Sequence, residues 1–148
     1  MTLKQISIFL ENSPGRLLEV TQAFGAAGIN LRALSLAGTS GFGVLRLIVS
    51  DLNKARNIAM EHHWPARVDN VLAVRLPDKS GSLADLLTPL KEAQIDVEYM
   101  YAFTGYSFEQ AVMIFGFKNI ENAVQALESF DADLISAEEF EVLESKGV

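Results

Sequence analysis

The segment Glu11-Asn12-Ser13-Pro14-Gly15-Arg16-Leu17 decides the fold, because a related segment, Pro77-Asp78-Lys79-Ser80-Gly81-Ser82-Leu83, follows 66 positions later. In both segments an apolar stretch ends at a short polar side chain, and a glycine stands three residues further on. The same shift aligns residues 6–10 with 72–76 and residues 28–31 with 94–97. A register kept over this length indicates an internal duplication.

Each copy has the same expected order of elements, βαββαβ. Alternating apolar residues predict strands, and apolar residues three or four positions apart predict helices. The expected strands of the first copy are residues 6–10, 29–36, 42–49 and 67–70. Its first helix has Ser13 as the expected N-cap, Pro14 as its first residue and Gly28 as its stop, and Asp51 caps its second helix.

The second copy repeats this order and follows without a linker. Its expected elements are strand 71–76, helix 82–93, strands 95–103 and 110–117, helix 120–129 and strand 133–142. Asn119 is the expected cap of the last helix. Crossover connections that pass over one face of the sheet place the helices of each copy on that face.

The other face of each sheet is apolar as well. Val44 and Ile48 flank Arg46 on one side of strand 42–49, and strand 110–117 is apolar on both sides. A strand with two apolar faces is normally covered on both. We therefore expect the open face to be buried against a second copy of the chain, most simply as a two-fold dimer.

Composition and charge exclude several classes of protein. The 148 residues include no cysteine, no signal-peptide pattern and no apolar run long enough to cross a membrane, which makes a cytoplasmic location the expectation. Of the net charge of −7, residues 1–72 contribute +2 and residues 73–148 contribute −9. An acidic half argues against a nucleic-acid partner, which needs a basic surface.

Catalytic motifs are not evident. The histidines, His62 and His63, are adjacent, so on a helix they point about 100° apart and make a poor metal clamp. No nucleophile pattern or phosphate-binding loop is present, and the pair Glu138-Glu139 falls in an expected strand as solvated charge. We expect no enzyme activity, no metal and no cofactor.

The turn that occurs twice is the most specific local feature. It joins a strand to the first turn of a helix, where free backbone N–H groups and the positive helix terminus suit a carboxylate. Gly15 and Gly81 let the backbone approach a ligand closely. Asn12 offers both a donor and an acceptor, as a zwitterion requires. An ordinary strand-to-helix turn is the alternative interpretation.

Residues 11–17, followed by Ala26-Ala27-Gly28-Ile29-Asn30, resemble the ACT domain, a small-molecule sensing module attached to many enzymes of amino-acid metabolism. The resemblance covers the chain as two tandem copies and is weaker in the second. It implies an α+β protein of two ferredoxin-like βαββαβ units, residues 1–71 and 72–148, with antiparallel sheets and helices on one face. In the family, an amino acid binds where two ACT units meet, between the first turn of one and the second strand of the other.

The resemblance implies a set of ligand-binding residues in both copies. In the first copy they are Asn12, Ser13, Pro14, Gly15, Arg16, Leu17, Asn30 and Leu31. In the second copy they are Asp78, Ser80, Gly81, Ser82, Leu83, Asp96, Val97, Glu98 and Tyr99. Asn12 can face residues 96–99, or Asp78 can face residues 30–33, and the sequence does not choose between these pairings.

The two copies differ at the gripping positions, where Asp78 and Asp96 replace Asn12 and Asn30. Two carboxylates repel a ligand carboxylate but attract an ammonium group, so the two copies do not offer equivalent sites. If only one copy supplies a working carboxylate grip, we expect it to be the first. The function that follows from the resemblance is a non-catalytic, homodimeric regulator that binds an amino acid and modulates an enzyme of amino-acid metabolism. The alternative is a structural regulatory subunit that acts through protein contact, with degenerate ligand sites.

Overall fold

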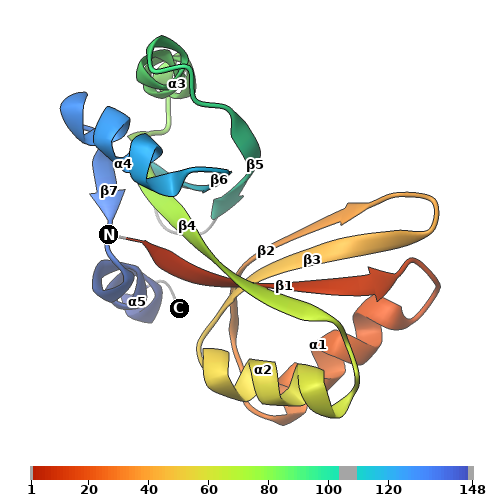
Figure 1. Cartoon of the computed structure of the whole chain (residues 1–148). Coiled ribbons are helices and arrows are strands. Elements are labelled where there is room, and N and C mark those ends of the chain that lie inside the picture. The colour runs from red at the N-terminus through yellow and green to blue at the C-terminus, as the bar shows by residue number, and fades with distance from the viewer. Residues whose placement is uncertain (1, 104–109, 147–148) are drawn as a thin grey trace. The chain divides into compact units, whose positions relative to one another are not determined.

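The computed structural model describes residues 2–103 and 110–146 and divides the chain into two compact units (Figure 1). The N-terminal unit is Lys4–Asp69, and the C-terminal unit begins at Asn70 and includes Leu3. Apart from the last expected strand, each helix and strand begins and ends within three residues of its expected bounds. The α+β class and the two tandem ferredoxin-like units are confirmed.

The N-terminal unit is a sheet with two helices on one face (Figure 1). Its elements are β1 (Leu3–Glu11), α1 (Arg16–Ala26), β2 (Leu31–Gly38), β3 (Phe42–Val49), α2 (Leu52–Glu61) and the first residues of β4 (Ala66–Pro77). The strand order is β2-β3-β1-β4, with β3 antiparallel to β1 and β2. Ile6, Ile8 and Leu45 of the sheet pack with Phe24 of α1 and Ala55 of α2 in one buried cluster.

The C-terminal unit repeats this plan around the second half of β4. Its further elements are α3 (Ser82–Glu92), β5 (Val97–Phe103), β6 (Gln110–Phe117), α4 (Ile120–Ser129), β7 (Asp133–Ile135) and α5 (Ala137–Lys146). β4 lies between β6 and β7, and β5 pairs with β6, all antiparallel. Leu72, Val74 and Phe115 of the sheet form a core with Leu90 of α3 and Leu127 of α4.

Two of the expected helix caps are correct and one is wrong. The side chain of Asp51 accepts the Lys54 N–H at 3.0 Å, and that of Asn119 accepts the Asn122 N–H at 3.2 Å. α1, however, begins at Arg16 with Gly15 as its cap and without a side-chain cap, so Ser13 and Pro14 lie before the helix. The reason is the left-handed conformation of Gly15 (φ +88°), which glycine adopts at little cost.

The expected strand 133–142 is wrong beyond residue 135. β7 ends at Ile135, and α5 follows, so Glu138 and Glu139 lie in the first turn of a helix. Ser136 stops the strand because its Oγ accepts the Glu139 N–H at 3.1 Å, as an N-cap does.

α5 is a fifth helix, and it contacts the sheet face opposite α3 and α4. Arg75 and Phe103 stand opposite Val112 in neighbouring strands and so share its face, while Val74 and Leu76 face the helices. An oxygen of Glu139 lies 3.6 Å from the Arg75 guanidinium. The ring of Phe140, which is only 2% exposed, lies 5.2 Å from that of Phe103. The two helices of the second βαββαβ unit, α3 and α4, share one face as expected, and α5 is an unexpected additional helix on the other face.

The second sheet face is already buried in the single chain at several positions. Val112 and Ile114 of β6, in the C-terminal unit, are buried without a second subunit. The apolar character of this face in the C-terminal unit is therefore not evidence for a dimer, and the dimer stays a prediction.

Candidate functional site

The first turn is held against the hairpin that joins β2 to β3. The Asn12 N–H donates to the Gly41 carbonyl at 3.3 Å, and the Asn12 side-chain Nδ2 donates to the Thr39 carbonyl at 2.9 Å. Because the amide nitrogen is engaged in this way, its partner Oδ1 is the atom left to accept a hydrogen bond from a ligand. The hairpin thus fixes the orientation of the Asn12 side chain.

A small pocket, which we call the turn pocket, lies at this contact. It has a volume of about 150 Å³. Its lining residues come from β1, the first turn, α1 and the hairpin: Leu10, Glu11, Asn12, Ser13, Arg16, Leu17, Leu36, Gly38 and Gly43. Asn12, Ser13, Arg16 and Leu17 were predicted as ligand-binding residues, and the structure brings these four together.

The hairpin residues of the turn pocket were missed from the sequence. Leu36, Gly38 and Gly43 approach Asn12 only through the pairing of β2 with β3 and β1. Gly38 lies so close to Asn12 that a Cβ added at Gly38 would be 3.6 Å from Asn12 Nδ2. The turn at residues 38–41 is recognisable in the sequence, but its contact with the end of β1 follows only from the order of the strands in the sheet.

The charge in the turn pocket is concentrated on Arg16. Its guanidinium lies 3.1 Å from a carboxylate oxygen of Glu19 and 3.2 Å from one of Glu11. Hydrogen bonds to Glu19 and then Glu11 raise the pKa of Arg16 above its ordinary value, so the side chain is always charged. A ligand anion can therefore pair with Arg16 only in competition with these two carboxylates.

The start of α1 supplies uncompensated backbone donors. Gly15 accepts the Glu19 N–H at 3.0 Å, and the Arg16 N–H donates to Ser13 at 3.3 Å. For the N–H groups of Leu17 and Leu18, the described residues provide no acceptor. Free N–H groups in the first helical turn suit a carboxylate, while Asn12 Oδ1 suits an ammonium group. Together they match the two ends of an amino acid.

Asn30 and Leu31 lie elsewhere in the N-terminal unit. Asn30 precedes β2, where its N–H donates to Ser50 Oγ at 2.9 Å, whereas Gly38 beside Asn12 is the last residue of that strand. At about 3.3 Å per residue, β2 separates the two positions by more than 20 Å. One unit therefore cannot bring Asn12 and Asn30 to the same ligand, and Pro14 and Gly15 shape the turn without lining the pocket.

The predicted residues of the second copy are spread over three places. Ser82 is buried at the start of α3, and Gly81 (φ +89°) caps that helix as Gly15 caps α1. Asp96 and Val97 line an open groove of about 490 Å³ with the C-terminal end of α3. Tyr99 lies over Gly116, where an added Cβ would overlap its ring. The remaining predicted residues, Asp78, Ser80, Leu83 and Glu98, line none of these described cavities.

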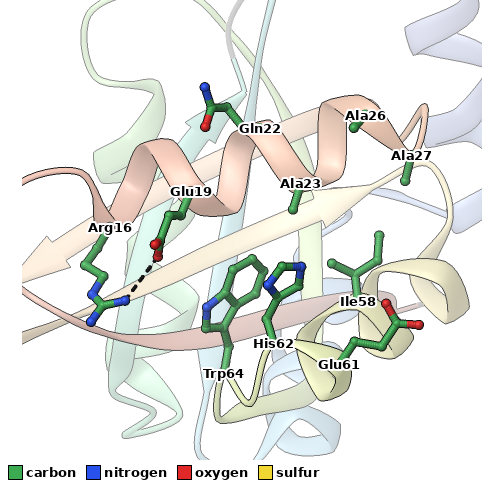
Figure 2. Close-up of a pocket in the computed structure, with 10 residues that line it drawn as sticks. All are labelled: Arg16, Glu19, Gln22, Ala23, Ala26, Ala27, Ile58, Glu61, His62 and Trp64. Atoms are coloured by element: carbon green, nitrogen blue, oxygen red, sulfur yellow. Dashed lines mark hydrogen bonds and ion pairs between the residues drawn. The ribbon is translucent and has the colours of Figure 1, made fainter.

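A larger groove, of about 740 Å³, lies between α1 and α2 of the N-terminal unit (Figure 2). Ala23 of α1 and Ala27, just after this helix, face Ile58 of α2 there, and the rings of Trp64 and His62 stack with centroids 4.4 Å apart. Arg16 lines this groove as well as the turn pocket.

Neither a metal cluster nor a membrane span is evident in the part of the chain that the structure describes. Within residues 2–103 and 110–146, no three side chains of His, Cys, Asp or Glu gather to hold a metal ion. Among the same residues, every helix is too short or too polar to cross a bilayer.

Comparison with known proteins identifies the family. Residues 1–143 match the family described as "ACT domain pair", so the chain belongs to it. An ACT domain pair is a regulatory module, and the resemblance noted in the sequence is confirmed. No curated protein matches the chain.

Solved structures show the same fold. The chain is 36% identical to protein BT0572 from Bacteroides thetaiotaomicron, covers 95% of its own length and 96% of that chain, and superposes with a TM-score of 0.87. The regulatory subunits of aspartate kinase from Thermus thermophilus and Thermus flavus are each 16% identical, with TM-scores of 0.62 and 0.59. These matches cover 86% and 85% of the chain and 90% of each subunit.

Proposed function

We propose that this protein is a non-catalytic, cytoplasmic regulator that binds an amino acid at the turn pocket and modulates a partner enzyme of amino-acid metabolism. The two ACT units are residues 1–71 and 72–148. The observation that carries the proposal is the turn pocket itself, where Asn12 Oδ1 and the free N–H groups of α1 offer matched sites for ammonium and carboxylate. The solved regulatory subunits of aspartate kinase share this fold.

The turn pocket supports a site that a second unit completes. Its volume of about 150 Å³ is below the roughly 300–1,000 Å³ of ordinary ligand pockets. β2 is an edge strand of the sheet in the N-terminal unit, and its apolar side chains Leu34 and Leu36 are about half exposed. An edge strand with exposed apolar residues invites pairing with another strand. A homodimer in which a second copy covers this edge would close the pocket.

A thermal-shift screen of the twenty proteinogenic amino acids against the full chain tests ligand binding. A ligand at ten times its dissociation constant should raise the melting temperature by about 3–6 °C. Asn12→Ala should weaken binding roughly 10- to 150-fold, because it removes a hydrogen bond to a charged group. Asn53→Ala, on the exposed surface of α2, is the matched control. If no amino acid stabilises the protein, ligand sensing is refuted.

Light scattering during size-exclusion chromatography tests the dimer. Leu34→Glu places a charge on the β2 edge and should give monomers that no longer bind the amino acid. Met60→Glu, on the most exposed large apolar side chain of α2, should leave both properties unchanged. A wild-type protein that is monomeric with and without ligand would refute the completed site.

The second candidate is a structural subunit that acts through protein contact alone. Asp78 and Asp96, where the first copy has asparagine, favour it, because carboxylates at both positions disfavour a ligand carboxylate. Stoichiometric co-purification of an enzyme, with no response to any amino acid in the screen, is the result expected for this alternative.

A further inference from the structure

The duplication places Trp64 and Ala132 at equivalent positions. The backbone N–H of Trp64 donates to the Ala59 carbonyl at 2.9 Å, and the backbone N–H of Ala132 donates to the Leu127 carbonyl at 3.0 Å, so the same backbone hydrogen bond recurs 68 positions later. The residues just before them, His63 and Asp131, both have φ +57°. The backbone of the two copies therefore follows the same path here, while the side chain changes from indole to methyl.

In the N-terminal unit the indole lies beside the start of α1 and forms part of the wall of the groove between α1 and α2. Trp64 lies edge-on to Phe24 with ring centroids 6.3 Å apart, and it packs against the buried core of that unit. Figure 2 shows the ring below α1, between Arg16 and Ala23. By the repeat shift of 66 positions, Ser82 and Asp85 of the second copy are equivalent to Arg16 and Glu19 of the first.

The C-terminal unit has a hollow at the equivalent place, which we call the Ala132 hollow. It has a volume of about 320 Å³, within the range of ordinary ligand pockets. Its apolar wall consists of Leu76, Leu86, Phe130 and Ala132. Two large side chains of the first copy, Trp64 and Arg16, are replaced here by alanine and serine, which accounts for the open space.

A buried hydroxyl adjoins the Ala132 hollow without a partner. Ser82, which lines it, is only 9% exposed, and its Oγ has no hydrogen-bond partner among the described residues. Leaving a buried hydroxyl unpaired is unfavourable. A donor group brought into the hollow by a ligand would supply the missing partner.

The rim of the Ala132 hollow is negative. Arg75, which lines it, is shared between Asp133 at 3.2 Å and Glu139 at 3.6 Å. Lys79, Asp85 and Asp131 also lie at the rim. The five charged residues that line the hollow sum to −1, which is larger in magnitude than the partial positive charge of about +0.5 at the N-terminus of α3.

We propose that the Ala132 hollow is a second ligand site, which takes a planar aromatic ring of indole size that carries an ammonium group. The ring replaces the indole that the first copy supplies from its own chain, its N–H donates to Ser82 Oγ, and the ammonium group meets the acidic rim. The site lies within the C-terminal unit and does not depend on the turn pocket.

Calorimetry of the full chain with tryptamine tests this site. Tryptamine should bind with one equivalent per chain, and indole-3-acetate, with a negative tail, should bind at least tenfold more weakly. Ala132→Trp should fill the hollow and abolish tryptamine binding, whereas Asn12→Ala should leave it unchanged. The proposal is overturned if wild type does not bind tryptamine, if Ala132→Trp binds it equally well, or if indole-3-acetate binds as tightly.

Ser82→Ala keeps the test decisive if Ala132→Trp does not fold. Loss of the hydroxyl should weaken tryptamine about two- to tenfold, the range for one hydrogen bond. The affinity for 1-methyltryptamine, which lacks the ring N–H, should not change. An unchanged affinity for tryptamine would show that the ring does not reach Ser82, against the proposal.

Discussion

Replacing Phe140 by alanine tests how α5 is attached to the C-terminal unit. The Phe140 side chain is 98% buried and contacts the Phe103 ring at 5.2 Å. A buried aromatic side chain removes about 150–250 Å² from water. At roughly 25 cal/mol per Å² this corresponds to about 4–6 kcal/mol as an upper bound. Measured truncations of Phe in cores cost about 3–5 kcal/mol, and we expect Phe140→Ala to fall in that range.

Urea denaturation followed by circular dichroism measures this loss, and amide hydrogen exchange locates it. Exchange should accelerate first in α5, because α5 is attached through Phe140 and the Arg75–Glu139 ion pair. Glu141→Ala, at an exposed position of the same helix, should change the free energy of unfolding by less than about 0.5 kcal/mol. If Phe140→Ala costs no more than Glu141→Ala, the packing of α5 described above is wrong.

Two further substitutions test the backbone and the C-terminal sheet. Gly81→Ala forces a side chain into the left-handed region at φ +89° and should lower the free energy of unfolding, measured in urea, by about 1–2 kcal/mol. Gly25→Ala, inside α1 with open space around it, is the control and should raise that free energy by up to about 1 kcal/mol. Gly116→Ala should displace the Tyr99 ring that covers it and lower the melting temperature. In a double-mutant cycle, adding Tyr99→Ala should recover part of this loss. If the effects of the two substitutions simply add, the contact between Tyr99 and Gly116 is contradicted.

The sequence was sufficient for the order of elements wherever local pattern and duplication agreed. It failed at α5, although Ser136-Ala137-Glu138-Glu139 has the spacing of a helix-capping box. The closing strand expected in the first copy, residues 67–70, corresponds to residues 133–136, so the expected strand 133–142 disregarded both the repeat and the cap signal at Ser136. The cap of α1 was missed for a related reason, since Ser13 has cap chemistry but Gly15 has the backbone freedom that the turn requires.

The candidate site could be predicted only in part. Asn12 and Arg16 are close in sequence, so the turn segment was sufficient to place them together. Leu36 and Gly38 reach the turn pocket through strand pairing, which depends on the sheet order. The Ala132 hollow was not predicted, because the sequence does not show that Ala132 stands where the first copy has Trp64. The equivalence of these two residues follows from the matching backbone hydrogen bonds and dihedral angles.

β4 is one continuous strand, Ala66–Pro77, that neither copy holds alone. Its first residues belong to the N-terminal unit, beside β1, and its later residues lie between β6 and β7 of the C-terminal unit. A genetic deletion of either repeat would leave the survivor with an unpaired, aggregation-prone strand edge. Two copies that share one strand can differ in their side chains, as Trp64 and Ala132 do, but neither copy can be removed without exposing that edge.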